Sequence, residues 1–158
     1  PPTTEPPETE PPETEPPQTQ PPAGKEGLKE RKSIMIDFNN ASFVKLRPVN
    51  DNAFEKMVAP ILVDNEEIVR SFQSIRDGVV FTNLRIITIN IQGITGKKKD
   101  FTSLPYSKIQ AFSVETAGAF DLDSELELWF SGMGRIKLEF IGATDVAYLC
   151  KLISKKVL

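Results

Sequence analysis

The chain has 158 residues, a formal net charge of −3, no histidine and a single cysteine, Cys150. Its length is that of one ordinary domain, and the lack of histidine removes the commonest general base and the usual nitrogen ligand of zinc. One cysteine cannot form an internal disulfide or a multi-cysteine metal site, and no apolar run approaches the roughly 18 residues of a membrane-spanning helix, so we expect a cytoplasmic protein.

The start of the chain differs from the rest in composition. Residues 1–22 read PPTTEPPETEPPETEPPQTQPP and hold ten of the 13 prolines, five glutamates and no aliphatic or aromatic residue. Such a segment cannot bury apolar surface to offset the entropy of ordering it, and its paired prolines favour an extended polyproline II conformation. We therefore expect residues 1–24 to be a disordered tether. A ligand for a groove that binds proline-rich peptides is the alternative, although no PxxP motif with a flanking Arg or Lys is present.

The charge of the remaining residues argues against nucleic acid as a partner. The tail holds five acidic residues and no basic ones, so residues 23–158 carry a net charge of +2. A value this close to zero gives no field strong enough to attract DNA or RNA. Residues 25–34, which include the run KEGLKERK, are expected to be a charged, solvated linker.

Two apolar runs that favour strands, IMIDF and SFVKL, precede a predicted short helix. The helix lies in NDNAFEKMVAPILVDNEE, where Asn52 is the expected N-cap and Glu55 stands at the position that returns a hydrogen bond to the cap. Pro60 should kink or shorten this helix. Its apolar face would consist of Phe54, Met57, Val58 and Ile61.

Beyond Asp64 the pattern is that of short strands separated by turn residues. The runs are EIVRSFQSI, GVVFT, RIITINIQ, KIQAFSVET, ELELWF and RIKLEF. In ELELWF, the residues Leu126, Leu128 and Phe130 alternate with two glutamates and Trp129. Because side chains of a strand alternate between its faces, the first set should face the core and Trp129 should point outward.

The chain closes with a predicted amphipathic helix at about residues 144–157, with Thr144 as the expected N-cap. Its apolar residues recur at spacings of three and four. They are Val146, Leu149, Ile153 and Val157. Six or seven short strands followed by one such helix predict an α+β domain, in which the C-terminal helix caps a strongly bent antiparallel sheet or partly open barrel.

Strands followed by one closing helix are also the order of a pleckstrin-homology (PH) domain, and particular residues sharpen the comparison. From residue 76, RDGVVFTNLRIITINIQGITGKKKDFTSLPYSKIQAFSVETAGAFDLDSELELWFSG closely resembles the short bacterial PH-like family. The residues that carry the likeness are Arg76-Asp77, Phe81-Thr82-Asn83 with Arg85, Gln92-Gly93 with Gly96-Lys97-Lys98, Pro105-Tyr106 with Ile109, and Glu115-Thr116-Ala117-Gly118 with Phe120-Asp121. The resemblance covers about residues 35–158 and implies a PH-like domain that self-assembles into a homo-oligomeric ring. Fold analogy with eukaryotic lipid-binding modules does not transfer their activity.

The stretch QGITGKKKDF contains the candidate anion-binding residues. A phosphate-binding P-loop needs four residues between its glycines and a helix after its lysine, whereas here two residues separate Gly93 from Gly96 and a strand is expected next. Lys97, Lys98 and Lys99 remain a candidate patch for an anionic membrane surface, where each lysine contributes about 1 kcal/mol. The alternative is the solvated end of a hairpin.

The acidic stretch ETAGAFDLDSELEL invites a metal site, because Glu115, Asp121, Asp123 and Glu125 offer oxygen ligands. Their order is not that of an EF-hand loop, and a polar connection into a strand is the simpler interpretation. No nucleophile, oxyanion-stabilising donors or cofactor motif accompany these carboxylates. We therefore predict no catalytic residue, no cofactor and no metal site.

Trp129 is the candidate oligomer contact, because an outward-pointing indole is a common anchor at protein interfaces. The alternative is that Trp129 covers the sheet locally or packs under the N-terminal segment. Glu127 and Lys137 on facing strands are expected to pair beside it. The sequence thus predicts a non-enzymatic PH-like module that self-assembles and presents a surface to a protein partner of unknown identity. The alternatives are a peripheral module that binds anionic membranes through Lys97–Lys99 and, in third place, an enzyme.

Overall fold

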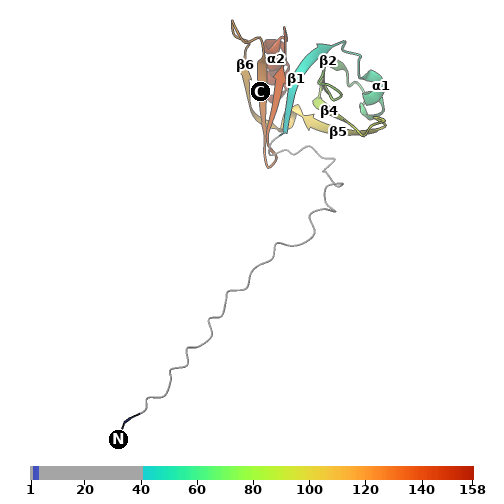
Figure 1. Cartoon of the computed structure of the whole chain (residues 1–158). Coiled ribbons are helices and arrows are strands. Elements are labelled where there is room, and N and C mark those ends of the chain that lie inside the picture. Colours follow the sequence, from blue (N-terminus) through green and yellow to red (C-terminus); the bar gives the residue numbers. More distant parts are fainter. Residues whose placement is uncertain (1, 4–40) are drawn as a thin grey trace. The chain divides into compact units, whose positions relative to one another are not determined.

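The computed structural model describes residues 2–3 and 41–158, and eight strands of the second range form one sheet (Figure 1). Their order across the sheet is β5-β4-β3-β2-β1-β8-β7-β6. The strands are β1 (Ala41–Val49), β2 (Ile68–Gln73), β3 (Gly78–Thr82), β4 (Arg85–Gln92), β5 (Lys98–Pro105), β6 (Ile109–Glu115), β7 (Ser124–Phe130) and β8 (Gly134–Phe140). The expected tether, the charged linker and the IMIDF strand lie outside the described residues.

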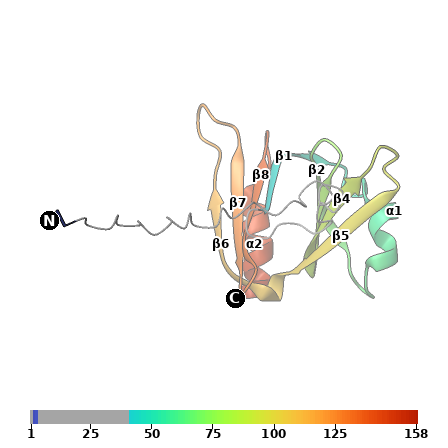
Figure 2. The ribbon, with the colours of Figure 1, turned by 60° about the horizontal axis from the view of Figure 1, so that its bottom comes forward.

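Strand β1 joins the two halves of the sheet. It pairs antiparallel with β2 near its end and parallel with β8 near its beginning. Its register shifts between Phe43 and Leu46, and Lys45 there has a positive φ of 56°. Such a bulge bends a strand, so one part of β1 extends β2–β5 and the other extends β6–β8. Figure 2 shows these two groups of strands on either side of β1.

The predicted fold class is confirmed, since the sheet is strongly bent and open and one helix, α2 (Val146–Val157), follows it near the C-terminus. Two details differ. The described sheet has eight strands rather than six or seven, because β5 was missing from the expected runs. The β1–β8 pair is parallel, an arrangement that a hairpin cannot produce, and the two strands are far apart in the sequence.

Both halves of the sheet and α2 contribute to the main hydrophobic core. In β7 the residues Leu126, Leu128 and Phe130 are buried, and in β8 the same holds for the three apolar residues that alternate with charged ones. The predicted alternation of these two strands is therefore confirmed. Helix α2 adds Val146, Leu149 and Ile153 to the core.

A second apolar cluster lies under the short helix α1 (Glu55–Val58) and the 3₁₀ turn η2 (Ala59–Ile61) that continues it. Phe54 and Val58 pack there against β3 and β4. Every residue of β3 is buried, because the main core covers one face and this cluster the other. A Cβ at Gly78 would stand 2.5 Å from the Phe54 ring, so only glycine permits this close approach.

The helix ends differ from the predictions. The N-cap position of α1 is Phe54, with no side-chain cap, and the Asn52 N–H donates to the side-chain oxygen of Asn50 at 2.9 Å. At α2 the N-cap is Asp145, whose carboxylate accepts from the Tyr148 N–H at 2.9 Å. The expected cap Thr144 is therefore wrong, because the chain enters the helix one residue later.

Candidate functional site

The outer face of β6–β8 carries the predicted contact residue, and we define this surface by Ala111, Ser113, Glu125, Glu127, Trp129, Arg135 and Lys137. Burial alternates along β7, and Trp129 is partly exposed on the side opposite the buried leucines. The predicted orientation of Trp129 is thus confirmed. Its register partners are Ala111 on β6 and Arg135 on β8. Ala111 is small and lies on the last strand of the sheet, and the indole as a whole is mostly covered and only partly exposed.

Ion pairs occupy the rest of this outer face. Arg135 binds Glu127 at 2.9 Å, and Lys137 binds Glu125 at 2.6 Å. The expected Glu127–Lys137 pair is wrong, although the two residues are direct register partners. The pairs run diagonally instead, because long side chains on a sheet reach the diagonal neighbours as well as the opposite one. The hydrogen bond from Lys137 to Glu125 raises the pKa of the lysine.

The three lysines do not share one flat patch. Lys97 lies in the turn between β4 and β5, whereas Lys98 and Lys99 are the first residues of β5. The last two lysines are therefore strand residues at the end of the hairpin. Neighbouring residues of a strand point to opposite faces, so Lys98 and Lys99 diverge. Lys97 and Lys98 are exposed, and Lys99 is partly exposed.

The loop between β2 and β3 is hydrogen-bonded to the end of the β4–β5 hairpin. Arg76 donates from Nη2 to the Gly93 carbonyl at 2.5 Å, and Asp77 accepts from the Ile91 N–H at 2.9 Å. Both residues belong to the family-like pattern found in the sequence. Their contacts give them a structural role, which is to hold the ends of two hairpins together.

A buried ion pair, which the sequence reasoning did not single out, lies near the opposite end of β3 and β4. The Glu66 side chain has no exposed surface, and its carboxylate accepts from Arg85 Nε at 2.8 Å and Arg85 Nη2 at 2.9 Å. Thr82 Oγ1 and the Val63 N–H also donate to it, at 2.8 Å and 3.0 Å. Arg85 further donates to the Ile61 carbonyl.

Further family-like residues complete this network. Tyr106 donates from its hydroxyl to the Thr82 carbonyl at 2.7 Å, and burial raises the pKa of this phenol well above its ordinary value. Asn83 accepts from the Glu67 N–H and donates to the Asn65 carbonyl. Each oxygen of the Glu66 carboxylate accepts two hydrogen bonds, so the arrangement positions the segment before β2. The only sequence signal for it was the FTN pattern with Arg85.

The acidic connection between β6 and β7 shows no metal-binding arrangement. In residues 2–3 and 41–158, no three His, Cys, Asp or Glu side chains lie close enough together to hold a metal ion. Within the loop, the Gly118 N–H donates to the Asp121 carbonyl at 2.7 Å, and Asp121 Oδ1 accepts from the Asp123 N–H at 3.0 Å. Phe120 is fully exposed at the tip, and Leu122 is largely exposed.

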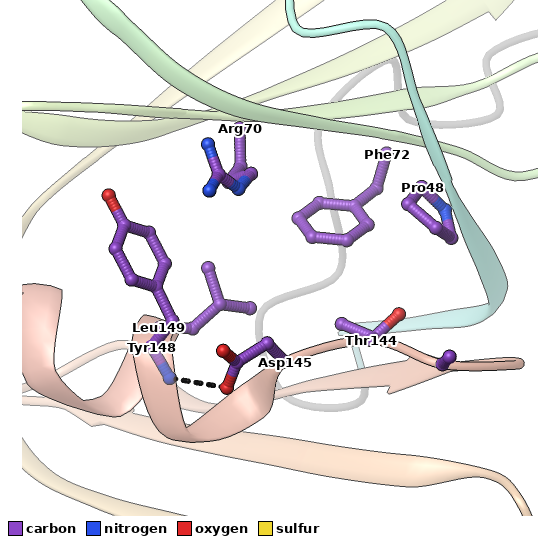
Figure 3. A pocket seen from close by; sticks show the side chains of 8 residues that line it. Pro48, Arg70, Phe72, Thr144, Asp145, Tyr148 and Leu149 are labelled. Carbon is purple, nitrogen blue, oxygen red and sulfur yellow. Dashed lines mark hydrogen bonds between the residues drawn. The ribbon is translucent and has the colours of Figure 1, made fainter.

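A small cavity of about 170 Å³ lies between β1, β2 and the start of α2 (Figure 3). Phe72 and Leu149 are buried and line it, and the Arg70 guanidinium stacks over the Tyr148 ring at 4.6 Å from the ring centroid. Arg70 also binds Asp51 at 3.3 Å. The cavity can accept a small apolar group beside a guanidinium that is already paired. Its three segments are far apart in the sequence, so no local pattern indicated it.

Comparisons with known proteins concern the domain as a whole. A family model described as "Bacterial PH domain" matches residues 37–157. The chain is 52% identical over 80 residues to the uncharacterized protein YjqA of Bacillus subtilis, a match that covers 51% of this chain and 64% of YjqA. This chain therefore spans less than two thirds of the length of that relative.

Two crystal structures have the same fold. A DUF1696 family protein with a pleckstrin-homology domain from Shewanella loihica gives a TM-score of 0.63 at 42% identity, and the match covers 73% of this chain and 100% of that one. A pleckstrin-homology domain from Shewanella amazonensis gives 0.54 at 43% identity, over 70% and 90% of the two chains. Within the described part of the molecule, no helix has the length and apolar character needed to span a membrane.

Proposed function

The chain belongs to the bacterial PH domain family, and on that premise we propose that it is a non-enzymatic interaction module. It assembles with copies of itself through the outer face of β6–β8 and presents the assembled surface to a protein partner. The observation that carries this proposal is the partly exposed indole of Trp129 beside the last strand of the sheet. A contact with another copy would cover the part of the indole that is still exposed, and this added apolar burial would stabilise the assembly.

The position of β6 at the edge of the sheet is a second argument for assembly through the outer face of β6–β8. This strand is the last in the order of the sheet, so one row of its backbone N–H and C=O groups has no strand partner among the described residues. Such an edge is a template for pairing with another chain. In a head-to-tail assembly, this face of one copy contacts a different surface of the next copy. Such a contact forms a closed ring when the rotation between neighbouring copies brings the last copy back to the first.

The loop between β6 and β7 is suited to the protein partner. Phe120 is fully exposed there, next to Leu122 and between acidic residues. Exposed aromatic side chains are the usual anchors of protein interfaces, and the flanking carboxylates favour a partner with basic groups around an apolar pocket. The outer face of β6–β8 serves self-assembly and the β6–β7 loop binds the protein partner, so substitutions can test the two surfaces separately.

The test is the mass of the protein by light scattering and analytical sedimentation. We expect an oligomer for the unchanged chain and smaller species for Trp129→Ala, because truncating an aromatic anchor costs about 2 kcal/mol or more at each interface. Ala111→Lys should act in the same direction, since it places a charge beside the intact indole. Phe120→Ala is the matched control, an exposed aromatic on another surface, and should keep the oligomer.

Three outcomes would contradict the proposal. A monomeric wild-type chain would remove self-assembly altogether. If Phe120→Ala dissociated the oligomer as much as Trp129→Ala does, the assembly surface would not be the outer face of β6–β8. Loss of the circular dichroism of the sheet in Trp129→Ala, together with an unchanged mass for Ala111→Lys, would show that the indole supports the fold rather than an interface.

A further inference from the structure

The cavity between β1, β2 and the start of α2 is separate from both surfaces of the interaction module. Its volume is about 170 Å³. An apolar cavity of about 150 Å³ can hold a benzene ring, so this one has room for a single ring or a branched aliphatic group. Phe72 and Leu149 are buried and line it with apolar surface. Edge-on contacts with Phe81 and Phe140, at centroid distances of 5.7 Å and 4.8 Å, hold the Phe72 ring in place.

Arg70 of β2 lines this cavity and has one unused edge of its guanidinium. The face of the guanidinium stacks on the Tyr148 ring, at 4.6 Å from the centroid. Its polar contacts both use Nη1, which lies 2.7 Å from the Val69 carbonyl and 3.3 Å from the Asp51 carboxylate. In the described part of the chain, Nε and Nη2 have no hydrogen-bond partner. These two nitrogens form the side-on edge that binds a carboxylate through two parallel hydrogen bonds.

Asp145 brings a carboxylate to the opposite side of the same cavity. Figure 3 shows Arg70 on the side of β2 and Asp145 at the start of α2. Oδ1 of Asp145 accepts from the Tyr148 N–H at 2.9 Å, whereas its Oδ2 has no hydrogen-bond partner among the described residues. Arg70 pairs with Asp51 and not with Asp145, although both Arg70 and Asp145 line the cavity. The cavity therefore offers a donor edge and an acceptor oxygen with apolar surface between them.

We propose that this cavity binds a free α-amino acid with a compact apolar side chain, such as leucine. The carboxylate of the ligand accepts hydrogen bonds from Nε and Nη2 of Arg70, and its ammonium group donates to Oδ2 of Asp145. The side chain of the ligand fills the apolar space beside Phe72 and Leu149. This binding site goes beyond the interaction module proposed above and does not depend on self-assembly.

The two opposite charges select this class of ligand. A simple anion would pair with Arg70 and be repelled by Asp145, and a simple cation would meet the reverse, whereas a zwitterion pairs with both residues. A residue inside a polypeptide has neither a free carboxylate nor a free ammonium group on its backbone, and a chain terminus has only one of them. A free α-amino acid carries both on one carbon atom, next to its side chain. The limited volume favours a branched aliphatic or single-ring side chain over a larger one.

Titration of the 158-residue chain with leucine and its derivatives, followed by amide chemical shifts, tests the proposal. We expect leucine to cause saturable shifts at Phe72, Tyr148 and Leu149, and none at the Trp129 indole. Alanine should bind about tenfold or more weakly, because each methylene that is no longer buried lowers the affinity about fourfold. N-acetylleucine has no ammonium group and leucinamide has no carboxylate. Each should bind about tenfold or more weakly than leucine, since hydrogen bonds between charged groups are lost.

Two substitutions remove one charge each and keep the chain folded. Asp145→Asn retains the N-cap of α2, because asparagine caps a helix as well as aspartate does, and Arg70→Gln removes only an exposed ion pair. Each should lower the affinity for leucine about tenfold or more. Asp145→Asn should not weaken binding of N-acetylleucine, and Arg70→Gln should not weaken binding of leucinamide, because each of these ligands lacks the matching group.

Matched controls make the same changes in charge at exposed positions outside the cavity. Asp64→Asn removes a negative charge before β2, and Lys155→Gln removes a positive charge near the end of α2. Both should bind leucine as the wild type does. Circular dichroism of all four variants should match that of the wild type, because substitutions on an exposed surface have small effects on stability.

The proposal is overturned if leucine at tens of millimolar causes no saturable shift at the cavity, or if alanine binds as tightly as leucine. It is also overturned if Asp145→Asn and Arg70→Gln bind leucine as the wild type does, or if the control variants lose affinity to the same degree. Tighter binding of N-acetylleucine than of leucine would assign the cavity to the C-terminus of a peptide instead. Tighter binding of leucinamide would assign it to a peptide N-terminus, and either result would refute a site for the free amino acid.

Discussion

At the scale of single residues, Glu66 shows how a charge is held inside this domain. Burial alone would raise the pKa of its carboxyl, but hydrogen bonds from Arg85, the Val63 N–H and Thr82 outweigh it, and the pKa lies below its ordinary value of 4.5. A buried carboxylate is stable in the interior when both of its oxygens are hydrogen-bonded. Removing one member of a buried ion pair leaves the charge of the other without a partner. The pair thereby ties the segment before β2 to the turn between β3 and β4.

We predict that Glu66→Gln lowers the free energy of unfolding by about 3 kcal/mol near neutral pH, toward the lower end for a buried pair because Arg85 is partly exposed. The folded-state pKa of Glu66 lies below the unfolded one. Its contribution to stability is therefore fully present above pH 4.5 and is lost as the pH falls through the folded-state pKa. The difference between wild type and variant should narrow in acid.

Denaturant unfolding over a pH series measures both effects. Glu127→Gln is the control, because Glu127 pairs with the exposed Arg135 on the outer face. This substitution should lower the free energy of unfolding much less than Glu66→Gln. Equal destabilisation by the two substitutions would show that the buried pair has no special role. A gap between wild type and Glu66→Gln that stays constant into strong acid would show that the charge of Glu66 is not what stabilises the fold.

At the scale of elements, the start of α2 illustrates a choice between two adjacent capping residues. Thr144 and Asp145 are both good N-caps by type. The structure uses Asp145, which accepts from the Tyr148 N–H, whereas the Thr144 Oγ1 is buried without a hydrogen-bond partner in the described residues. A buried hydroxyl without a partner costs free energy, so the two residues should respond in opposite ways to removal of their polar atoms.

We predict that Asp145→Ala lowers the free energy of unfolding by about 1 kcal/mol, the usual cost of losing a cap. Thr144→Val keeps the shape of the side chain and should leave stability unchanged or raise it. Thermal and denaturant unfolding of the two variants, compared with the wild type, provides the measurement. If Thr144→Val were the more damaging of the two, the threonine would be the working cap and the assignment to Asp145 would be wrong.

At the scale of the whole molecule, the proline-rich start of the chain and the domain are expected to be independent. Residues 1–22 contain no aliphatic or aromatic side chain, so they have nothing to bury against the domain. Deleting residues 1–24 should therefore leave the melting temperature and the oligomeric mass unchanged. Circular dichroism on heating and light scattering of the shortened chain check this. A drop of several degrees on deletion would mean that the segment packs on the domain.

Much of the fold could be predicted because its signals are local. The alternation of Leu126, Leu128 and Phe130 with polar residues gave the correct face of β7, and the outward position of Trp129 followed from it. The spacing of Val146, Leu149 and Ile153 gave the buried face of α2. β5 was missed as a separate run, because lysines at its start and polar residues within it weaken the strand pattern.

Only some of the site residues could be predicted from such local signals. The lysines and Trp129 were singled out as candidates because each stands out in composition or alternation, and their roles stay predictions. Arg70 and Asp145 were not predicted to line one cavity, since β2 and the start of α2 are far apart in the sequence. The FTN pattern with Arg85 indicated that these residues matter, but not that Glu66 is their partner.

The sequence by itself determined which residues alternate in β7 and β8, which face of α2 is apolar, and that the chain resembles bacterial PH domains. Only the tertiary structure decided the diagonal ion pairs of the outer face, the bend of β1 at Lys45, and the junction of the two hairpin ends through Arg76 and Gly93. The physical reason is distance along the chain. Alternation is set between neighbouring residues, whereas these contacts join separate segments, and the twist and bend of the assembled sheet determine which of them meet.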